Sequence, residues 1–228
     1  MDLKKNLGKR IIIYLLGLFI VAVGIRLTLI AQLGTGSSTA FAWAMSKTVG
    51  QSVAFWMFCE NALCVLVQVL ILRKDFKPIQ LIQLLVSFIF SMFIAYADPI
   101  VRWWVPGSYV ERLIQLVVAI MLNAFGIFLV VKAKLVTMPP ESMNLAIMKK
   151  TGKGKLGTYK IIFDACWFIL ALLISLIVTL KSGNFTISGF LSLAGIREGT
   201  VLQVLLIGAF INLYDKLFGK HFRTLTED

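Results

Sequence analysis

The sequence alternates between long apolar runs and short polar segments. Six of the apolar runs are close to twenty residues long, and a bilayer core about 30 Å thick takes about 20 apolar residues in an α-helix that rises about 1.5 Å per residue. None of the six contains a proline, so each can form an uninterrupted helix. The pattern therefore predicts an all-α polytopic membrane protein with six transmembrane helices. The runs cover approximately residues 11–32, 53–72, 79–97, 113–131, 159–180 and 201–217.

The composition agrees with a membrane protein and excludes an ordinary soluble enzyme. Apolar residues make up 59% of the 228 residues, against roughly 45–50% in soluble domains. The three cysteines, Cys59, Cys64 and Cys166, all lie within predicted spans, where a small apolar filler is favoured over a disulfide or a metal ligand. The single histidine, His221, follows the last span and belongs to no Cys/His cluster. We therefore expect no metal and no cofactor.

The basic residues are distributed unequally between the two sides of the predicted spans. Lys and Arg number 23 against 11 Asp and Glu, which gives a formal net charge of +12. With the N-terminus in the cytoplasm, 17 basic residues fall in or at the edge of cytoplasmic segments and five fall outside, while Arg26 lies within the first span. Cytoplasmic loops are enriched in Lys and Arg. We therefore expect a multi-pass protein of the plasma or inner membrane, with both termini in the cytoplasm and residues 218–228 as a cytoplasmic tail.

The placement of the basic residues also bears on the partners. They form short clusters between apolar runs and are not interleaved with exposed aromatic residues on one folded face, as nucleic-acid binding would require. The expected partner is therefore the lipid bilayer and not a nucleic acid.

The sequence contains an internal repeat. A shift of 102 residues superposes 22–50 on 124–152 with ten identities in 29 positions. The residue frequencies alone would give about two or three identities. A two-residue gap then places Glu60 opposite Asp164. The match therefore predicts that the two halves of the chain are copies of one structural unit.

The number of spans in each copy determines how the copies are oriented. Repeat 1 covers about 8–98 and repeat 2 about 110–217 of a single membrane domain over 1–228. Each copy contains three spans, and because three is odd, the second copy enters the membrane from the opposite side. We therefore expect a 3+3 inverted-topology repeat, an architecture that recurs in secondary transporters. Inverted repeats also occur in membrane proteins that transport nothing, and this alternative stays open.

The first span and the segment after it carry short glycine-rich motifs. They are Tyr14-Leu15-Leu16-Gly17-Leu18-Phe19, Gly24-Ile25 and Ala31-Gln32-Leu33-Gly34-Thr35-Gly36-Ser37-Ser38. With these motifs the chain resembles the bacterial YczE/YitT-like integral membrane proteins, which share a glycine-rich span followed by an A-x-L-G-x-x-P stretch. Ser37 stands at the proline position here, whereas the second copy has Pro139 and Pro140. The resemblance covers nearly the whole chain and implies a small polytopic protein of the bacterial inner membrane, but little about function.

Two short helices are predicted, one after the first span and one after the fourth. Free backbone N–H groups and the positive end of the dipole at a helix start can hold an anion such as a carboxylate or a phosphate. Such helices can be re-entrant between the two halves, or they can lie at the interface as plain connectors, and both alternatives stay open. The two helix starts are formed by Gly34, Thr35, Gly36, Ser37 and Ser38 and by Pro139 and Glu141.

Arg26 and Glu60 are predicted to lie at similar depths in the first and second spans. Isolated charges are costly there, so we expect the two side chains to form a buried pair. Such a pair can lock the structure. It can also act as a gate that opens when Glu60 is protonated or when a substrate carboxylate takes over the Arg26 guanidinium. Snorkelling of Arg26 to the outer headgroups is a third option.

Asp164 is the counterpart of Glu60 in the second repeat. Two acids related by an inverted repeat suit a proton- or cation-coupled cycle in which each is exposed in turn. The alternative is a carboxylate paired with Lys160, four residues earlier. Asp98 and Asp215 lie at the ends of the third and sixth spans, where a solvated end or a helix cap is expected.

Together these features favour a small secondary transporter or permease. It would bind a small solute between the two repeats, near the membrane midplane, and anions are one candidate class of solute. Transport would be coupled to a proton or another cation. The alternative is a non-transporting binding or accessory protein, such as a sensor, a lipid-binding element or an assembly partner. An enzyme is not expected, because the spans lack a nucleophile–base pair and a set of metal ligands. A homodimer is possible, and this alternative is left open. The expected substrate-binding residues are Arg26, Gly34, Thr35, Gly36, Ser37, Ser38, Asn123, Pro139 and Glu141, and the expected coupling or gating residues are Glu60 and Asp164.

Overall fold

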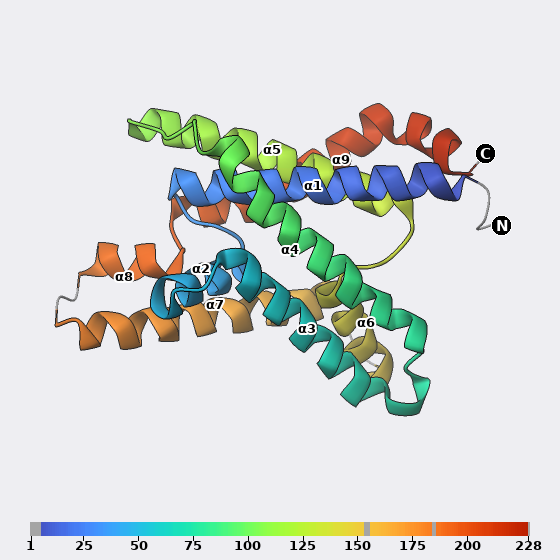
Figure 1. Ribbon diagram of the computed structural model, residues 1–228, viewed down its shortest axis with the longest axis horizontal. Coiled ribbons are helices and arrows are strands. Elements are labelled where there is room, and N and C mark those ends of the chain that lie inside the picture. The colour runs from blue at the N-terminus through green and yellow to red at the C-terminus, as the bar shows by residue number, and fades with distance from the viewer. Residues whose placement is uncertain (1–5, 153–155, 184–185, 228) are drawn as a thin grey trace. The chain divides into compact units, whose positions relative to one another are not determined.

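The computed structural model describes residues 6–152, 156–183 and 186–227. In these ranges the chain forms nine α-helices and two short 3₁₀-helices, with no strand (Figure 1). The 3₁₀-helices, η1 (Arg73–Asp75) and η2 (Pro78–Leu81), lie in the turn between α3 and α4. The α-helices are α1 (Leu7–Ala31), α2 (Ser37–Val49), α3 (Val53–Leu72), α4 (Ile82–Val101), α5 (Tyr109–Ala133), α6 (Pro139–Thr151), α7 (Leu156–Lys181), α8 (Ile187–Ala194) and α9 (Glu198–Glu227).

Six helical stretches among the described residues are long and apolar enough to cross a membrane. This confirms the six predicted apolar helices and indicates a multi-pass membrane protein. The helix α4 continues beyond the predicted span through Pro99 to Val101. The helix α8 was not predicted from the sequence, because it is only eight residues long and too short to stand out as an apolar run. The predicted cytoplasmic tail, residues 218–228, is not structurally separate from the last span, since α9 continues through this segment to Glu227.

The helices of the two halves recur at the shift found in the sequence. The helices α1 and α5 are each 25 residues long and begin 102 residues apart. The short helices α2 and α6 are each 13 residues long and also begin 102 residues apart. Each of the four is followed by a residue with a left-handed backbone, which ends the helix, namely Gln32, Lys134, Gly50 and Gly152. The two short helices predicted after the first and fourth spans are thus confirmed as helices.

The described residues divide into two compact units, and each unit contains helices from both halves of the sequence. The first unit comprises Met1–Leu33, Phe93–Leu135 and Glu198–Asp228, and therefore holds α1, the end of α4, α5 and α9. The second unit comprises Gly34–Met92 and Val136–Arg197, and therefore holds α2, α3, the start of α4, α6, α7 and α8.

In the first unit, α1 and α5 pack closely through small residues. A Cβ atom built at Gly17 would lie 2.9 Å from the Gly126 carbonyl oxygen, and one built at Gly126 would lie 2.7 Å from the Gly17 carbonyl oxygen. One built at Gly24 would lie 3.0 Å from the Ala119 carbonyl oxygen. The contact partner moves back along α5 as the residue moves forward along α1, so the helices are antiparallel. Small residues at such a crossing let two membrane helices approach backbone to backbone.

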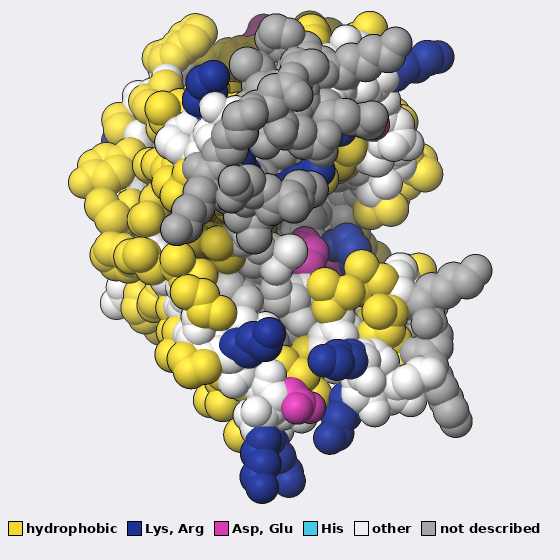
Figure 2. All heavy atoms as spheres, turned by 90° about the vertical axis from the view of Figure 1, so that its right-hand side faces the viewer, with side chains coloured by type: hydrophobic (Ala, Val, Ile, Leu, Met, Phe, Trp, Pro, Cys, Tyr) yellow, Lys and Arg dark blue, Asp and Glu magenta, His cyan; other side chains and the backbone are white. Residues whose placement is uncertain are grey.

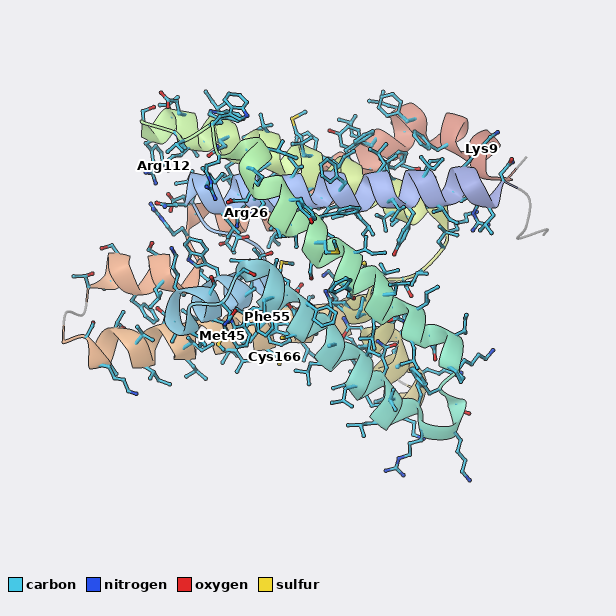
Figure 3. All side chains as sticks on the ribbon, viewed as in Figure 1. Lys9, Arg26, Met45, Phe55, Arg112 and Cys166 are labelled. Carbon is cyan, nitrogen blue, oxygen red and sulfur yellow. The ribbon has the colours of Figure 1, made fainter. Side chains whose placement is uncertain are left out.

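Two arginines hold the ends of this helix pair. Arg10 of α1 donates from Nε to the Ala133 carbonyl oxygen at 2.9 Å, at the end of α5. Arg112 of α5 donates from Nη1 to Gln32 Oε1 at 3.3 Å, just after the end of α1. Figure 3 shows Arg112 at one end of the pair and Lys9 at the other. Cationic side chains suit the negative ends of helix dipoles, so each helix supplies the arginine that stabilises the last turn of its partner.

In the second unit, the two short helices pack among α3 and α7. The helix α2 contacts α3 and α7, and α6 contacts the same two helices. Ala40 and Ala44 of α2 pack against Ala171 of α7 with no exposed surface, so α2 lies flush on α7. The helix α8 is tied to this group because Ser175 Oγ of α7 donates to the Phe190 carbonyl oxygen at 2.6 Å. The short helices α2 and α6 are therefore packed within a group of four helices, which consists of α2, α3, α6 and α7.

Candidate functional site

Two acids of the second unit meet the start of α2. Ser37 Oγ donates a hydrogen bond to Asp164 Oδ1 of α7 at 2.6 Å. The side chain of Ser38 is hydrogen-bonded to the carboxyl group of Glu60, which lies on α3. The residue before the helix, Gly36, provides no side-chain cap. The positive end of a helix dipole stabilises carboxylates, so the start of α2 brings together the two acids that the sequence repeat aligns.

Glu60 is the most enclosed acid of this group. Its side chain is 3% exposed, and its Oε1 atom has no hydrogen-bond partner among the described residues. An unpaired polar atom in a protein interior is unfavourable by about 1–3 kcal/mol, and by more when it carries charge. Glu60 therefore offers a free acceptor next to the start of α2, where a proton or a cationic donor can bind.

Two further charged side chains complete what we call the polar cluster. Lys160 Nζ lies 3.4 Å from Asp164 Oδ2, one helical turn away on α7, which confirms the pairing considered as the alternative for Asp164. Glu141, in the first turn of α6, interacts electrostatically with both of these residues and with Glu60. The polar cluster thus holds three carboxyl groups and one ammonium group. Its members are Ser37, Ser38, Glu60, Glu141, Lys160 and Asp164.

An aromatic group, which we call the ring cluster, adjoins the polar cluster. The ring centroids of Phe41 and Trp167 are 4.5 Å apart, and those of Phe163 and Trp167 are 5.9 Å apart. Cys64 and Met143 pack with these rings. Cys64 also interacts electrostatically with Glu60 and Glu141. The same four helices, α2, α3, α6 and α7, therefore supply both clusters.

The helices around the two clusters can be followed in Figure 3. Met45 on α2, Phe55 on α3 and Cys166 on α7 mark three of them, and α2 contacts both of the others. Cys166 is exposed, whereas Cys64 is buried. The cysteine next to the clusters is therefore the enclosed one.

The other residues predicted for the site lie in three places. Gly34, Thr35 and Gly36 form the turn before α2, and Thr35 N donates to the Gly195 carbonyl oxygen at 3.0 Å. Pro139 begins α6, and its carbonyl oxygen accepts from Gln68 Nε2 at 3.2 Å. Asn123 lies in the first unit, where its side chain is buried against Gly24 of α1.

Arg26 does not form the predicted pair with Glu60. Its guanidinium forms an ion pair with Asp98 of α4, and Arg102 binds the other oxygen of the same carboxylate. The prediction of a solvated end or cap at Asp98 is therefore wrong as well, because this side chain is only 22% exposed. The Asp215 side chain pairs with Lys132 at 2.6 Å and is 54% exposed, which fits the solvated span end predicted there. The physical reason is that α4 continues past its predicted end to Val101, and side chains of its second half reach α1, as the Phe19–Phe93 ring contact at 5.6 Å also shows. Arg26 is labelled in Figure 3.

Replacing Asp98 by Asn is expected to destabilise the protein by about 1–3 kcal/mol. The Arg26 and Asp98 side chains are only 20% and 22% exposed, so the loss leaves a largely enclosed guanidinium without its counter-ion. Asp75→Asn is the matched control, since Asp75 is exposed in the turn after α3, where a surface charge contributes less than about 1 kcal/mol. Thermal unfolding of both variants in detergent measures the difference, and equal shifts would contradict the assignment.

The family of the chain follows from a match over residues 8–216. The chain belongs to DUF6198, a family of unknown function. No curated protein and no solved structure matches the chain significantly. The resemblance to the YczE/YitT-like proteins therefore stays a prediction.

This DUF6198 protein has a second buried polar group, in which Gln68 links two helices and the α4 residues Gln83, Ser87 and Ser91 were not predicted from the sequence. Gln68 Nε2 of α3 donates to Gln83 Oε1 of α4 at 3.2 Å, and the two side chains are 0% and 4% exposed. Ser87 and Ser91 continue the polar line of α4 at intervals of four residues, and both are buried. That spacing within an apolar run was the signal that could have found them, because residues four apart share one helix face.

Proposed function

We propose that this protein is a small secondary carrier that binds its solute at the polar cluster, near the membrane midplane. The observation that carries the proposal is the enclosed carboxyl group of Glu60, which keeps one oxygen without a partner beside the start of α2. Ionisable groups kept inside a membrane protein mark ion and substrate paths more often than they serve stability. The proposed coupling residues are Glu60 and Asp164, through binding of a proton or a cation.

The arrangement of the helices supports an inverted-topology repeat. A shift of 102 residues turns Gly17 into Ala119 and Gly24 into Gly126, so the Gly17–Gly126 contact and the Gly24–Ala119 contact are exchanged by the repeat. Because α1 and α5 are antiparallel, this exchange corresponds to a two-fold axis between them. The polar cluster combines α2 and α3 of the first half with α6 and α7 of the second. A site between such halves suits alternating access.

We further propose that both termini lie in the cytoplasm of a bacterial cell. The support is the excess of basic residues on that side in the sequence. The turn between α3 and α4 carries the exposed residues Arg73, Lys74 and Lys77. Figure 2 shows Lys and Arg side chains standing out over this turn. A turn of this kind suits contact with anionic headgroups of the inner leaflet.

The proposal is tested by flux into liposomes that contain the purified protein. A panel of small organic cations, organic anions and neutral solutes is offered, with and without a pH gradient. We expect uptake of one class above that of protein-free liposomes, and we expect Asp164→Asn to reduce it about tenfold, since a charge-assisted hydrogen bond is lost. Absence of flux for every class would favour the accessory-protein alternative and overturn the carrier.

A further inference from the structure

We infer that the polar cluster and the ring cluster together bind a small organic cation of the alkylammonium class, and that this cation displaces the ammonium group of Lys160 from Asp164. The inference rests on the proposed function in using the same site. It replaces the anionic solute considered from the sequence. Three observations carry it: the balance of charge, the adjoining rings and the exposure of Lys160.

The balance of charge favours a cation. The cluster contains the carboxyl groups of Glu60, Glu141 and Asp164, which become negative on losing a proton, and one ammonium group, that of Lys160. The guanidinium expected to bind an anion, that of Arg26, is engaged by Asp98. The start of α2, which was the other anion-binding element, already receives carboxylates through Ser37 and Ser38. An anion would therefore find neither a free guanidinium nor a free helix start, whereas a cation finds the free Oε1 of Glu60 and the carboxyl group of Asp164.

The spacing of the acids and the rings favours an organic cation over a metal ion. Within the described ranges, no three His, Cys, Asp or Glu side chains come close enough to ligate one metal ion. The acids are instead held by separate groups, Asp164 by Ser37 and Lys160, and Glu60 by Ser38. Trp167 lies three residues after Asp164 on α7, and Phe41 lies four residues after Ser37 on α2, so each ring shares a helix face with a member of the polar cluster. Aromatic faces attract alkylammonium groups, more strongly when water is excluded.

Lys160 already places one ammonium group in the cluster. Its side chain is 57% exposed and its Nζ is 3.4 Å from Asp164, so the pair is a weak one that contributes less than about 1 kcal/mol. A free alkylammonium ion is chemically similar to the end of a lysine side chain and can take the same carboxylate. Lys160 then returns to solvent. In this arrangement Lys160 competes with the solute and keeps Asp164 neutralised when the site is otherwise empty.

The test is binding to the purified full-length protein in detergent. Methylammonium and tetramethylammonium chloride are titrated by calorimetry and by thermal shift, with sodium chloride and sodium acetate as controls. We expect the ammonium salts alone to bind and to raise the melting temperature. Stabilisation by acetate without binding of either ammonium salt would overturn the inference.

Two variants test the roles of the residues. Lys160→Met removes the competing ammonium from an exposed position and is expected to tighten binding of methylammonium about fivefold. Trp167→Leu is expected to weaken binding of tetramethylammonium about tenfold, while Trp167→Phe keeps a ring and most of the affinity. Trp103→Leu, at a side chain that is 82% exposed, is the matched control. Unchanged or weaker binding in Lys160→Met would overturn the displacement.

The outcomes also separate this inference from the carrier itself. Binding of alkylammonium ions with the expected variant effects, but without flux in liposomes, supports the site and contradicts the carrier. Flux of an anion or a neutral solute that depends on Asp164, without binding of alkylammonium ions, supports the carrier and contradicts the inference.

Discussion

Glu60→Gln is expected to reduce flux at least about 100-fold and at the same time to raise the melting temperature. The amide keeps the shape of the side chain but removes the charge that a cation or a proton would bind, a loss of about 1.5–3 kcal/mol per charge-assisted contact and more for an enclosed site. Glu60 is 3% exposed and one of its oxygens lacks a partner, so a negative charge on this side chain destabilises the folded state. Opposite changes in activity and stability are typical of functional residues.

The measurement pairs liposome flux with thermal unfolding in detergent. Asp75→Asn is the matched control, because Asp75 lies in the exposed turn directly after α3 and contributes the same chemical change without burial. We expect the control to keep both flux and melting temperature. A Glu60→Gln variant that transports normally would contradict the coupling role, and one that melts earlier would indicate that Glu60 serves to hold the structure together.

The spans could be predicted from the sequence because the bilayer sets their length. The second run was predicted at 53–72 and α3 has the same bounds, Val53–Leu72. The short helices were predicted from their glycine, serine and proline starts, and they follow the first and fourth spans as expected. The acids Glu60 and Asp164 stood out because an apolar background makes every charge conspicuous. Length and composition are one-dimensional properties, and a sequence reports them directly.

The partners of the charged side chains could not be predicted in the same way. Depth along a helix can be counted from the sequence, and Arg26 was matched with Glu60 because their predicted depths agreed. The direction in which a side chain points, and the helix that it meets, depend on packing. Here α4 continues to Val101 and brings Asp98 to Arg26, while Glu60 meets Ser38. The repeat alignment of Glu60 with Asp164 was the better guide, because both acids meet the same helix start.

Gly126→Ala is expected to destabilise the protein by about 1–3 kcal/mol, although alanine favours helices by up to about 1 kcal/mol over glycine. The added Cβ would lie 2.7 Å from the Gly17 carbonyl oxygen and 2.8 Å from the Val21 backbone nitrogen. Both are backbone atoms of α1, so no side-chain rotation relieves the clash and the two helices must separate. Their close contact, built on small residues, would be lost along with part of the dispersion attraction between them.

Gly208→Ala provides the matched control for this variant. Gly208 lies within α9, and a Cβ built there meets nothing within 4 Å, so the substitution changes helix propensity alone. We expect its melting temperature to rise slightly or to stay unchanged, while that of Gly126→Ala falls by several degrees in the same detergent. Gly17→Ala adds a Cβ 2.9 Å from the Gly126 carbonyl oxygen and should resemble Gly126→Ala. If all three variants melted together, the α1–α5 crossing would not be the close backbone contact on which the two-fold relation between the halves depends.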